Sequence, residues 1–144
     1  MEKVKTIIVE GVAISENTKI EEFISTGKFN LYENNHYRKL KTKEWITAFG
    51  ELFSGEFYFG SDYIHIELYP KLEISYPGHP SAEYERASYD FCKSIIENHF
   101  DDVTYKEDEV SVTLPHGKIS TFLGFDDGKT LCVGGYISIK VEVN

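Results

Sequence analysis

The sequence predicts an α+β fold: a largely antiparallel β-sheet with two or three helices packed on one face. A segment that begins near Ser81 combines a helix N-cap with apolar residues spaced three and four apart, which indicates an amphipathic helix. Most other apolar runs alternate with polar residues and are separated by short turns, as in hairpins. Helices and strands do not alternate regularly, so parallel crossovers are not expected, and residues 1–144 are expected to form a single α+β domain.

The first 26 residues predict a strand followed by a short helix. β-Branched residues favour a strand over residues 4–14, with a bend at Gly11. Thr18 and Glu21 have the spacing of a capping box, in which each side chain satisfies a backbone N–H group of the first helical turn. A helix is therefore expected near residues 19–26.

Two strand-like runs, residues 29–32 and 37–40, flank a turn-prone segment and predict a hairpin. A basic cluster lies on and just after its second arm. Four cations could bind a phosphate, but lysine also discourages unwanted pairing at a sheet edge, so we interpret the cluster as the solvent face of an edge strand. The cluster consists of Arg38, Lys39, Lys41 and Lys43.

Residues 42–55 predict a second helix, and the segments after it predict a meander of strands. Thr42 is expected to cap this helix and Trp45 to pack in the core, because an aromatic ring at helical spacing buries a large apolar area. Apolar and polar side chains alternate over residues 63–69, so one face of that strand is expected to be buried. Further strands are expected over residues 57–59 and 72–76.

The main helix is expected to start at Ser81 and to end near His99 and Phe100. Its core-facing stripe comprises Tyr84, Ala87, Ser88, Phe91, Ile95 and Asn98, widened by Cys92 and Ile96. Beyond it, alternation predicts strands over residues 110–114, 119–125, 131–133 and 136–143. A hairpin turn is expected at residues 126–129, and a bulge or kink at Gly134 and Gly135.

The net charge of −9 argues against two classes of partner. A protein that binds nucleic acid through its phosphates needs several unopposed cations, and an anionic membrane surface attracts basic segments. Residues 1–10 contain only a brief apolar run, too short for a signal-peptide core or a membrane span, so a cytoplasmic protein is expected. Cys92 and Cys132 lie far apart on a predicted helix and a predicted strand, and we interpret both as small buried hydrophobes.

No catalytic, cofactor or metal site is expected. The five histidines stand apart in the sequence, and none is paired with another metal-ligand residue at a suitable spacing. Cys92 and His99 share one helical face and could form a nucleophile and a base, but an inert core thiol near a helix-terminal imidazole is the favoured interpretation. His79 precedes the N-terminus of the main helix and could contact a substrate, but we interpret it as a turn residue because no acid or base partner can be assigned.

Acidity and aromatic content remain as functional signals. Ten tyrosines are present, and six acids with one base lie between Glu97 and Glu109. Tyrosine is common in protein interfaces, and carboxylates steer a basic partner, although a charge run can also be a solvated surface that keeps the protein soluble. The residues expected to bind a partner are Glu97, Asp101, Asp102, Tyr105, Glu107, Asp108 and Glu109.

In size, charge, tyrosine-rich strands and the acidic cluster between Glu97 and Glu109, the chain resembles small acidic bacterial immunity proteins that bind and block a toxin. The resemblance implies a non-enzymatic, cytoplasmic protein whose partner is a basic toxin domain, with no nucleic-acid or membrane partner. Two alternatives stay open. One is a ligand-binding domain with a pocket lined by Tyr63, His65, Tyr69 and Trp45, and the other is an enzyme with a site around His79 or His99.

Overall fold

The computed structural model describes residues 6–72, 82–125 and 132–143. Its elements, in chain order, are β1 (Ile7–Val9), β2 (Val12–Ile14), α1 (Ile20–Ile24), β3 (Phe29–Glu33), β4 (Arg38–Thr42), β5 (Ile46–Ala48), β6 (Glu51–Phe59), β7 (Tyr63–Pro70), α2 (Ala82–His99), β8 (Thr104–Lys106), β9 (Glu109–Leu114), β10 (Gly117–Phe125), β11 (Cys132–Gly134) and β12 (Ile137–Glu142). All strand pairs of the described residues are antiparallel. The expected α+β class, with a largely antiparallel sheet, is therefore confirmed.

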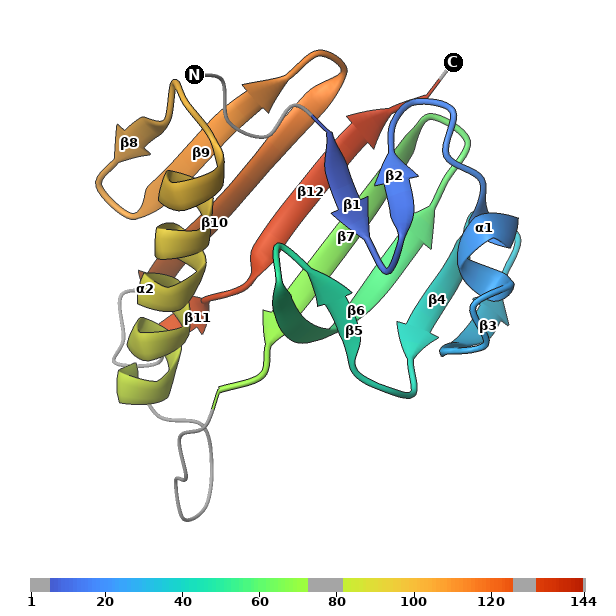
Figure 1. Ribbon diagram of the computed structural model, residues 1–144, viewed down its shortest axis with the longest axis horizontal. Helices are drawn as coiled ribbons and strands as arrows, with labels where there is room; N and C mark the ends of the chain where they lie inside the picture. Colours follow the sequence, from blue (N-terminus) through green and yellow to red (C-terminus); the bar gives the residue numbers. More distant parts are fainter. Residues whose placement is uncertain (1–5, 73–81, 126–131, 144) are drawn as a thin grey trace.

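The sheet divides at the long strand β6. The main order is β2-β1-β5-β6-β7-β12-β10-β9-β8, while β3 and β4 join beside β6, and β11 joins beside β10. The start of β6 pairs with β5, and its end pairs with β4 on the same edge. Figure 1 shows β1 and β2 in front of the central strands, with α2 and α1 in front of the two flanks of the sheet. One face of the sheet is thus covered by both helices and by the β1–β2 hairpin.

The core lies between this covered face and the elements in front of it. The largest fully buried side chains come from the sheet and from both helices, and they include Phe23, Phe53, Phe57, Ile66, Ile96, Ile137 and Ile139. The Phe23 ring of α1 packs edge to face on Phe29 and Phe57, with centroid distances of 5.7 and 4.9 Å. Because burying each such ring removes a large apolar area from water, this cluster holds α1 on the sheet.

The helix predicted over residues 42–55 does not exist. This segment forms β5, a turn and the first half of β6. The turn residues Phe49 and Gly50 both have positive φ angles, 55° and 76°, which end the strand and reverse the chain. Trp45 is not a core residue, because 44% of it is exposed and its ring lies under the Lys71 ammonium, 5.1 Å from the ring centroid. Burial instead follows strand alternation, with Ile46, Ala48 and Phe53 facing the core.

The N-terminal strand is a hairpin instead of one bent strand. Positive φ angles at Glu10 and Gly11 form a two-residue turn that pairs β1 with β2. The short helix is confirmed as α1, but Thr18 is not its capping residue. The Thr18 hydroxyl accepts the Ser15 N–H and donates to the Ala13 carbonyl. The first turn is closed by Glu22, whose carboxylate accepts the Lys19 N–H at 2.8 Å.

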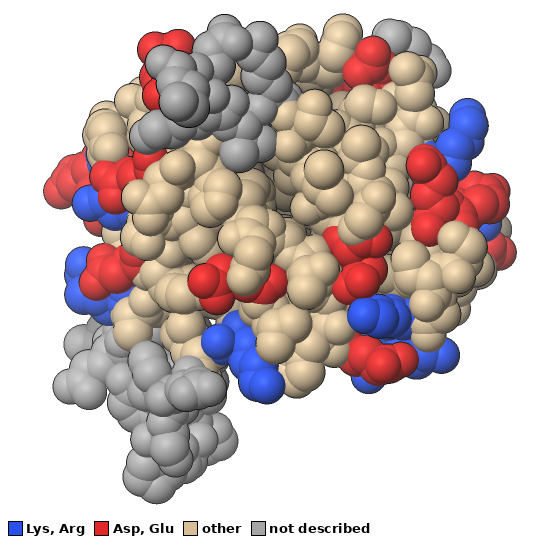
Figure 2. Space-filling view, in the orientation of Figure 1, with Lys and Arg blue, Asp and Glu red and all other residues tan. Residues whose placement is uncertain are grey.

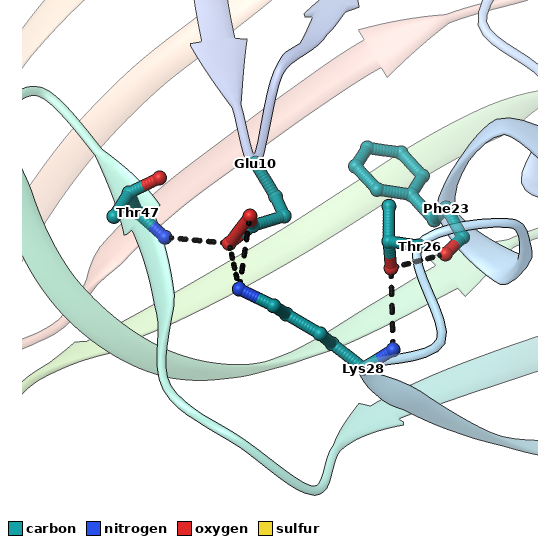
Figure 3. Close-up of polar contacts among 5 residues, drawn as sticks. All are labelled: Glu10, Phe23, Thr26, Lys28 and Thr47. Atoms are coloured by element: carbon teal, nitrogen blue, oxygen red, sulfur yellow. Dashed lines mark hydrogen bonds and ion pairs between the residues drawn. The ribbon is translucent and has the colours of Figure 1, made fainter.

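Glu10 fastens the hairpin to two other segments. Its carboxylate accepts hydrogen bonds from the Lys28 ammonium, at 3.2 and 3.3 Å, and from the Thr47 N–H, at 3.1 Å (Figure 3). The Glu10 N–H in turn donates to the Thr47 carbonyl at 2.7 Å. The Lys28 backbone is positioned by Thr26, whose hydroxyl accepts the Lys28 N–H and donates to the Phe23 carbonyl. The turn of the hairpin is therefore tied to β5 and to the chain after α1.

The hairpin over residues 29–40 is confirmed, but its basic arm is not an edge strand. β4 lies between β3 and β6, so its lysines do not protect an edge. Lys39 forms an ion pair with Glu56 at 2.5 Å, and Arg38 forms one with Glu33 at 3.1 Å. These pairs engage two of the four cations that could have held a phosphate.

The main helix is confirmed as α2, and so is most of its predicted core face. Ser88, Cys92 and Ile96 are buried, whereas Asn98, which was predicted to face the core, is exposed. The predicted cap Ser81 lies outside the described residues, and so does the side chain of Tyr84. Neither helix among the described residues has the length and apolar character that crossing a membrane would require.

The C-terminal strands follow the predicted alternation. Leu123 of β10 lies opposite Gly134, whereas Ser120 lies opposite Ser138. The segment from Gly134 to Ser138 therefore has one residue more than the part of β10 that it faces. The predicted bulge at Gly134 and Gly135 is thus confirmed. The predicted turn at residues 126–129 lies outside the described residues. Most of the predicted strand over residues 72–76 does too, and Leu72 itself is in no strand.

Candidate binding surface

The second face of the sheet is not covered by any described element. Along β6, β7 and β12 the buried residues alternate with side chains that point to this face. The helices and the β1–β2 hairpin all place their buried side chains in the core on the other side. We call this open surface the tyrosine face, and it comprises Tyr37, Lys39, Glu56, Tyr58, His65, Glu67, Tyr69, Phe122, Tyr136 and Ser138.

Aromatic rings contact one another in two groups on the tyrosine face. Tyr58 stacks on His65 at 5.9 Å and contacts Tyr37 edge to face at 5.8 Å. Tyr136 contacts Tyr69 at 5.1 Å and Phe122 at 5.3 Å. The rings come from the residue before β4, from β6, β7 and β10, and from the residue before β12, so long-range strand pairing assembles the surface. Mutual contact restricts the rotamers of these rings before any partner arrives.

Polar groups connect the aromatic rings. Glu56 and Glu67 are directly opposite on β6 and β7, where two like charges are unfavourable. The Lys39 ammonium neutralises Glu56, and the Tyr69 hydroxyl donates to Glu67 at 2.6 Å. The His65 Nε2 atom lies 3.1 Å from the Ser138 hydroxyl and 3.8 Å from the Glu67 carboxylate. The tyrosine face is therefore a connected network of rings and hydrogen bonds.

The pKa shifts on this face favour uncharged rings at neutral pH. Burial lowers the pKa of His65, and this outweighs the opposing effect of Glu67. Burial, followed by the hydrogen bond to Glu67, raises the pKa of Tyr69. Burial also raises the pKa of Tyr58 and of Tyr136. The Lys39 ammonium is stabilised, because its hydrogen bond to Glu56 raises the pKa of Lys39 despite partial burial.

Ser138, His65 and Glu67 do not have the geometry of a catalytic triad. In a triad the serine and the carboxylate contact opposite nitrogens of the imidazole. Here both groups lie on the same atom, Nε2, and the imidazole stacks flat against Tyr58. The arrangement holds His65 in place but gives Ser138 no general base with an orienting carboxylate behind it.

The residues predicted to bind a partner lie at one corner of the molecule, at the end of α2 and along the β8–β9 hairpin. We call them the acidic corner: Glu97, Asp101, Asp102, Tyr105, Glu107, Asp108 and Glu109. Asp101, Asp102, Glu107 and Asp108 are exposed. Glu97 accepts the Tyr105 hydroxyl at 2.6 Å, and Glu109 accepts the Lys118 ammonium at 3.1 Å.

Tyr105 stands on the helix side of the sheet, apart from the tyrosine face. It is 56% exposed, and the Lys93 ammonium lies 5.9 Å from its ring centroid. Figure 2 shows acidic and basic atoms side by side along the left margin, where α2 and β8 lie. Glu109 links the two surfaces, because it is the cross-strand partner of Phe122. The acidic corner therefore adjoins the tyrosine face at β9 but is not continuous with its centre.

No family model, no curated protein and no solved structure matches this chain. Its function has to be inferred from the surfaces themselves.

The four residues expected to line one ligand pocket do not lie together. Tyr63 and Tyr69 are near opposite ends of β7, about 20 Å apart at the rise of an extended strand. Trp45 and Tyr63 line two separate hollows, of about 270 and 590 Å³. His65 and Tyr69 instead take part in the network of the tyrosine face.

The two enzyme alternatives gain no support from the described residues. Cys92 is buried, its thiol donates to the Gly135 carbonyl at 3.8 Å, and burial raises its pKa to about 12. His99 is engaged elsewhere, since its Nδ1–H donates to the Ile95 carbonyl at 2.9 Å and its ring packs on Phe49. His79 lies outside the described residues. Within the described ranges, no group of three or more histidines, cysteines and carboxylates could hold a metal ion.

The sequence predicted that His65 and Tyr69 line a ligand pocket, but it did not predict most of the tyrosine face. The alternation on β12 predicts that Ser138 and Tyr136 face outward, yet it does not indicate that β12 lies beside β7. Placing residues 42–55 in a helix also concealed β6, and with it the pairing of Glu56 with Glu67. Alternation across residues 53–59 was the signal that could have found this strand.

Proposed function

We propose that this chain is a non-enzymatic binding protein of the toxin-immunity type, which blocks a basic protein partner by covering its active site. The tyrosine face is the contact surface, and the acidic corner guides the partner toward it. The observation that carries the proposal is the uncovered face of the sheet, with four interlocked tyrosines beside a phenylalanine and a histidine. We place its action in the cytoplasm, where a buried free thiol such as Cys92 remains reduced.

The tyrosine face has the composition of an interface centre. Tyrosine side chains carry much of the binding energy in protein complexes, because they bury a large area and lose little conformational entropy. Here the rings of Tyr58 and Tyr136 are already restrained by their neighbours. Ordering them on binding therefore costs little, which favours affinity.

The charge of the chain favours a basic partner. With a net charge of −9, the molecule attracts a positively charged protein over distances longer than direct contact. The exposed carboxylates Asp102, Glu107 and Asp108 of the acidic corner add to this field beside the tyrosine face. Such charges mainly accelerate association, whereas the packed rings mainly slow dissociation.

A binding role also agrees with the protonation states on this surface. Protonated tyrosines and a neutral His65 offer hydrogen-bond donors and acceptors without an activated nucleophile. Steric occlusion needs no chemistry of its own, only a complementary surface that excludes the partner's substrate.

The test is capture of the protein encoded next to this chain's gene, with purified wild-type chain as bait. The contact variant is Tyr58→Ala with Tyr136→Ala, and its control is Ile24→Ala, an exposed apolar residue on α1, which lies on the opposite, covered side of the sheet. We expect the contact variant to capture at least about tenfold less partner, and the control to equal the wild type. Equal capture by all three proteins would show that the tyrosine face is not the contact surface. No capture by the wild type would refute the immunity-type function.

A further inference from the structure

A hollow of about 590 Å³ lies at one end of the open sheet face, where the β9–β10 turn meets the end of β12 and the start of β7. Its lining includes Tyr63, Thr113, His116, Lys118, Lys140 and Glu142. The size is within the range of small-molecule sites.

Backbone contacts fix the shape of this hollow. The Glu142 N–H donates to the His116 carbonyl at 2.8 Å, and the Val143 N–H donates to the Asp62 carbonyl at 3.0 Å. Gly117 packs so closely on β12 that a Cβ atom there would collide with the Lys140 carbonyl group. The three chain segments are thus held together without a ligand, and the side chains on them keep a defined register.

Two lysines stand side by side in the hollow. Lys118 of β10 and Lys140 of β12 are direct cross-strand partners, a placement in which like charges repel. Lysine often protects an exposed sheet edge, but β10 and β12 are interior strands with neighbours on both sides. Edge protection therefore does not explain this pair.

The described residues do not fully neutralise the two ammonium groups. Lys118 bridges to Glu109 at 3.1 Å, but both side chains are partly exposed, and such surface pairs contribute little and exchange readily. The Lys140 ammonium makes no ion pair with any residue that the structure describes. Among the lining residues Glu142 supplies the carboxylate, which leaves a cationic centre on an otherwise acidic protein.

We propose that this hollow is a binding site for a small molecule that carries a phosphate-type dianion. The ammonium groups of Lys118 and Lys140 flank the phosphate, and the Thr113 hydroxyl, opposite Lys118 on β9, donates a further hydrogen bond. The Tyr63 ring at the rim contacts the organic part of the ligand. This site goes beyond the protein-binding function proposed above and does not depend on it.

The test is an amide NMR titration of the full chain with two probes, inorganic phosphate and phenyl phosphate, at constant ionic strength and neutral pH. We expect saturable shifts confined to residues 113–118 and 140–143 and, with phenyl phosphate, also Tyr63, with tighter binding of phenyl phosphate. The variant Lys118→Gln with Lys140→Gln should weaken binding about tenfold or more. The control, Lys41→Gln with Lys106→Gln, removes the same charge from exposed positions outside the hollow and should bind like the wild type.

Three results would overturn the proposal. The first is the absence of saturable shifts with both probes, and the second is equal weakening by the two double variants, which would indicate general charge attraction. The third is equal or tighter binding of benzoate, which would assign the hollow to carboxylates. Both double variants change only exposed side chains, so urea unfolding curves that match the wild type should verify that they fold.

Discussion

Glu10 illustrates how one side chain joins three segments that are distant in sequence. Its carboxylate is 16% exposed and accepts hydrogen bonds from Lys28 and from the Thr47 backbone. Hydrogen bonds to a charged acceptor contribute more to stability than those between neutral groups. The β1–β2 hairpin has few other polar ties to the rest of the sheet among the described residues, so this carboxylate should matter for folding.

We predict that Glu10→Ala lowers the free energy of unfolding by about 2 kcal/mol, because it removes the acceptor of a Thr47 N–H and the partner of Lys28. Glu10→Gln keeps an acceptor without the charge and should lose about half as much. The measurement is urea denaturation, monitored by circular dichroism. Glu51→Ala, at an exposed position, is the control and should stay within about 0.5 kcal/mol of the wild type. A cost at Glu10 no larger than at Glu51 would contradict the fastening role.

His65 should make stability depend on pH. Because burial lowers its pKa in the folded protein, the unfolded chain takes up a proton that the folded protein resists. The contribution of His65 to stability is therefore present above its ordinary pKa of about 6.5 and is lost as the pH falls through the lower folded value. Glu67 opposes this shift and Lys140 adds to it, but burial dominates.

The matched variant is His65→Gln, which does not titrate. We predict that the difference in unfolding free energy between the wild type and this variant is constant above about pH 7 and falls on acidification below about pH 6.5. The other histidines titrate in both proteins and cancel in the difference. Urea denaturation across this pH range measures it. A difference that grows on acidification would mean that Glu67 controls the pKa of His65 and that burial does not.

At the scale of elements, α2 shows what determines which face of a helix packs on the sheet. Periodicity predicted the helix and its length well, because a three-and-four spacing is a local signal. It could not choose between two overlapping apolar stripes, and it placed Asn98 on the core face. The bulge at Gly135 decides the choice, since its carbonyl accepts the Ser88 hydroxyl and the Cys92 thiol. That contact joins residues far apart in sequence, so spacing within the helix carries no trace of it.

We predict that Ile96→Ala lowers the free energy of unfolding by about 3 kcal/mol, because Ile96 is fully buried between α2 and the sheet. Asn98→Ala, two residues away on the exposed side, should change it by less than about 0.5 kcal/mol. Thermal and urea unfolding of the two variants provide the comparison. A larger loss at Asn98 than at Ile96 would contradict the packing of Ile96 against the sheet and the exposure of Asn98.

Residues 42–55 show a case in which helical spacing in the sequence predicts the wrong secondary structure. Trp45, Ala48, Phe49 and Leu52 have helical spacing, yet the chain forms two strands joined at Phe49 and Gly50. A positive φ at Phe49 is unusual for an aromatic residue and has no sequence signature. Pairing of β6 with β4, β5 and β7 satisfies more backbone groups than a short helix could, and this tertiary gain overrides the local pattern.

At the scale of the whole molecule, function and topology are linked. Local hairpins such as β3–β4, β6–β7 and β9–β10 were predictable because short turns specify them. The pairing of β12 with β7 was not, and it is this pairing that places Tyr136 and Ser138 beside Tyr69 and His65. The acidic corner was found from sequence because its residues are contiguous. The tyrosine face was not, because its residues come from five separate segments.

The division of roles between the two surfaces gives a kinetic prediction at this scale. Reversal of Asp102, Glu107 and Asp108 to lysine should slow association with the basic partner at low salt, and the effect should fade as salt screens the charges. Its control reverses Glu44, Glu51 and Asp62, which are exposed acids away from the acidic corner, and so changes the net charge equally. We expect the control to slow association less. If both triple variants behave alike, net charge guides the partner and the acidic corner has no special part.

If the open sheet face makes the contact with a protein partner, the dissociation rate of that complex should depend on its aromatic rings. With the product of the neighbouring gene immobilised, we expect Tyr58→Ala with Tyr136→Ala to raise the dissociation rate at least about tenfold and to change the association rate little. A dissociation rate equal to that of the wild type, with the unfolding curve unchanged, would contradict it.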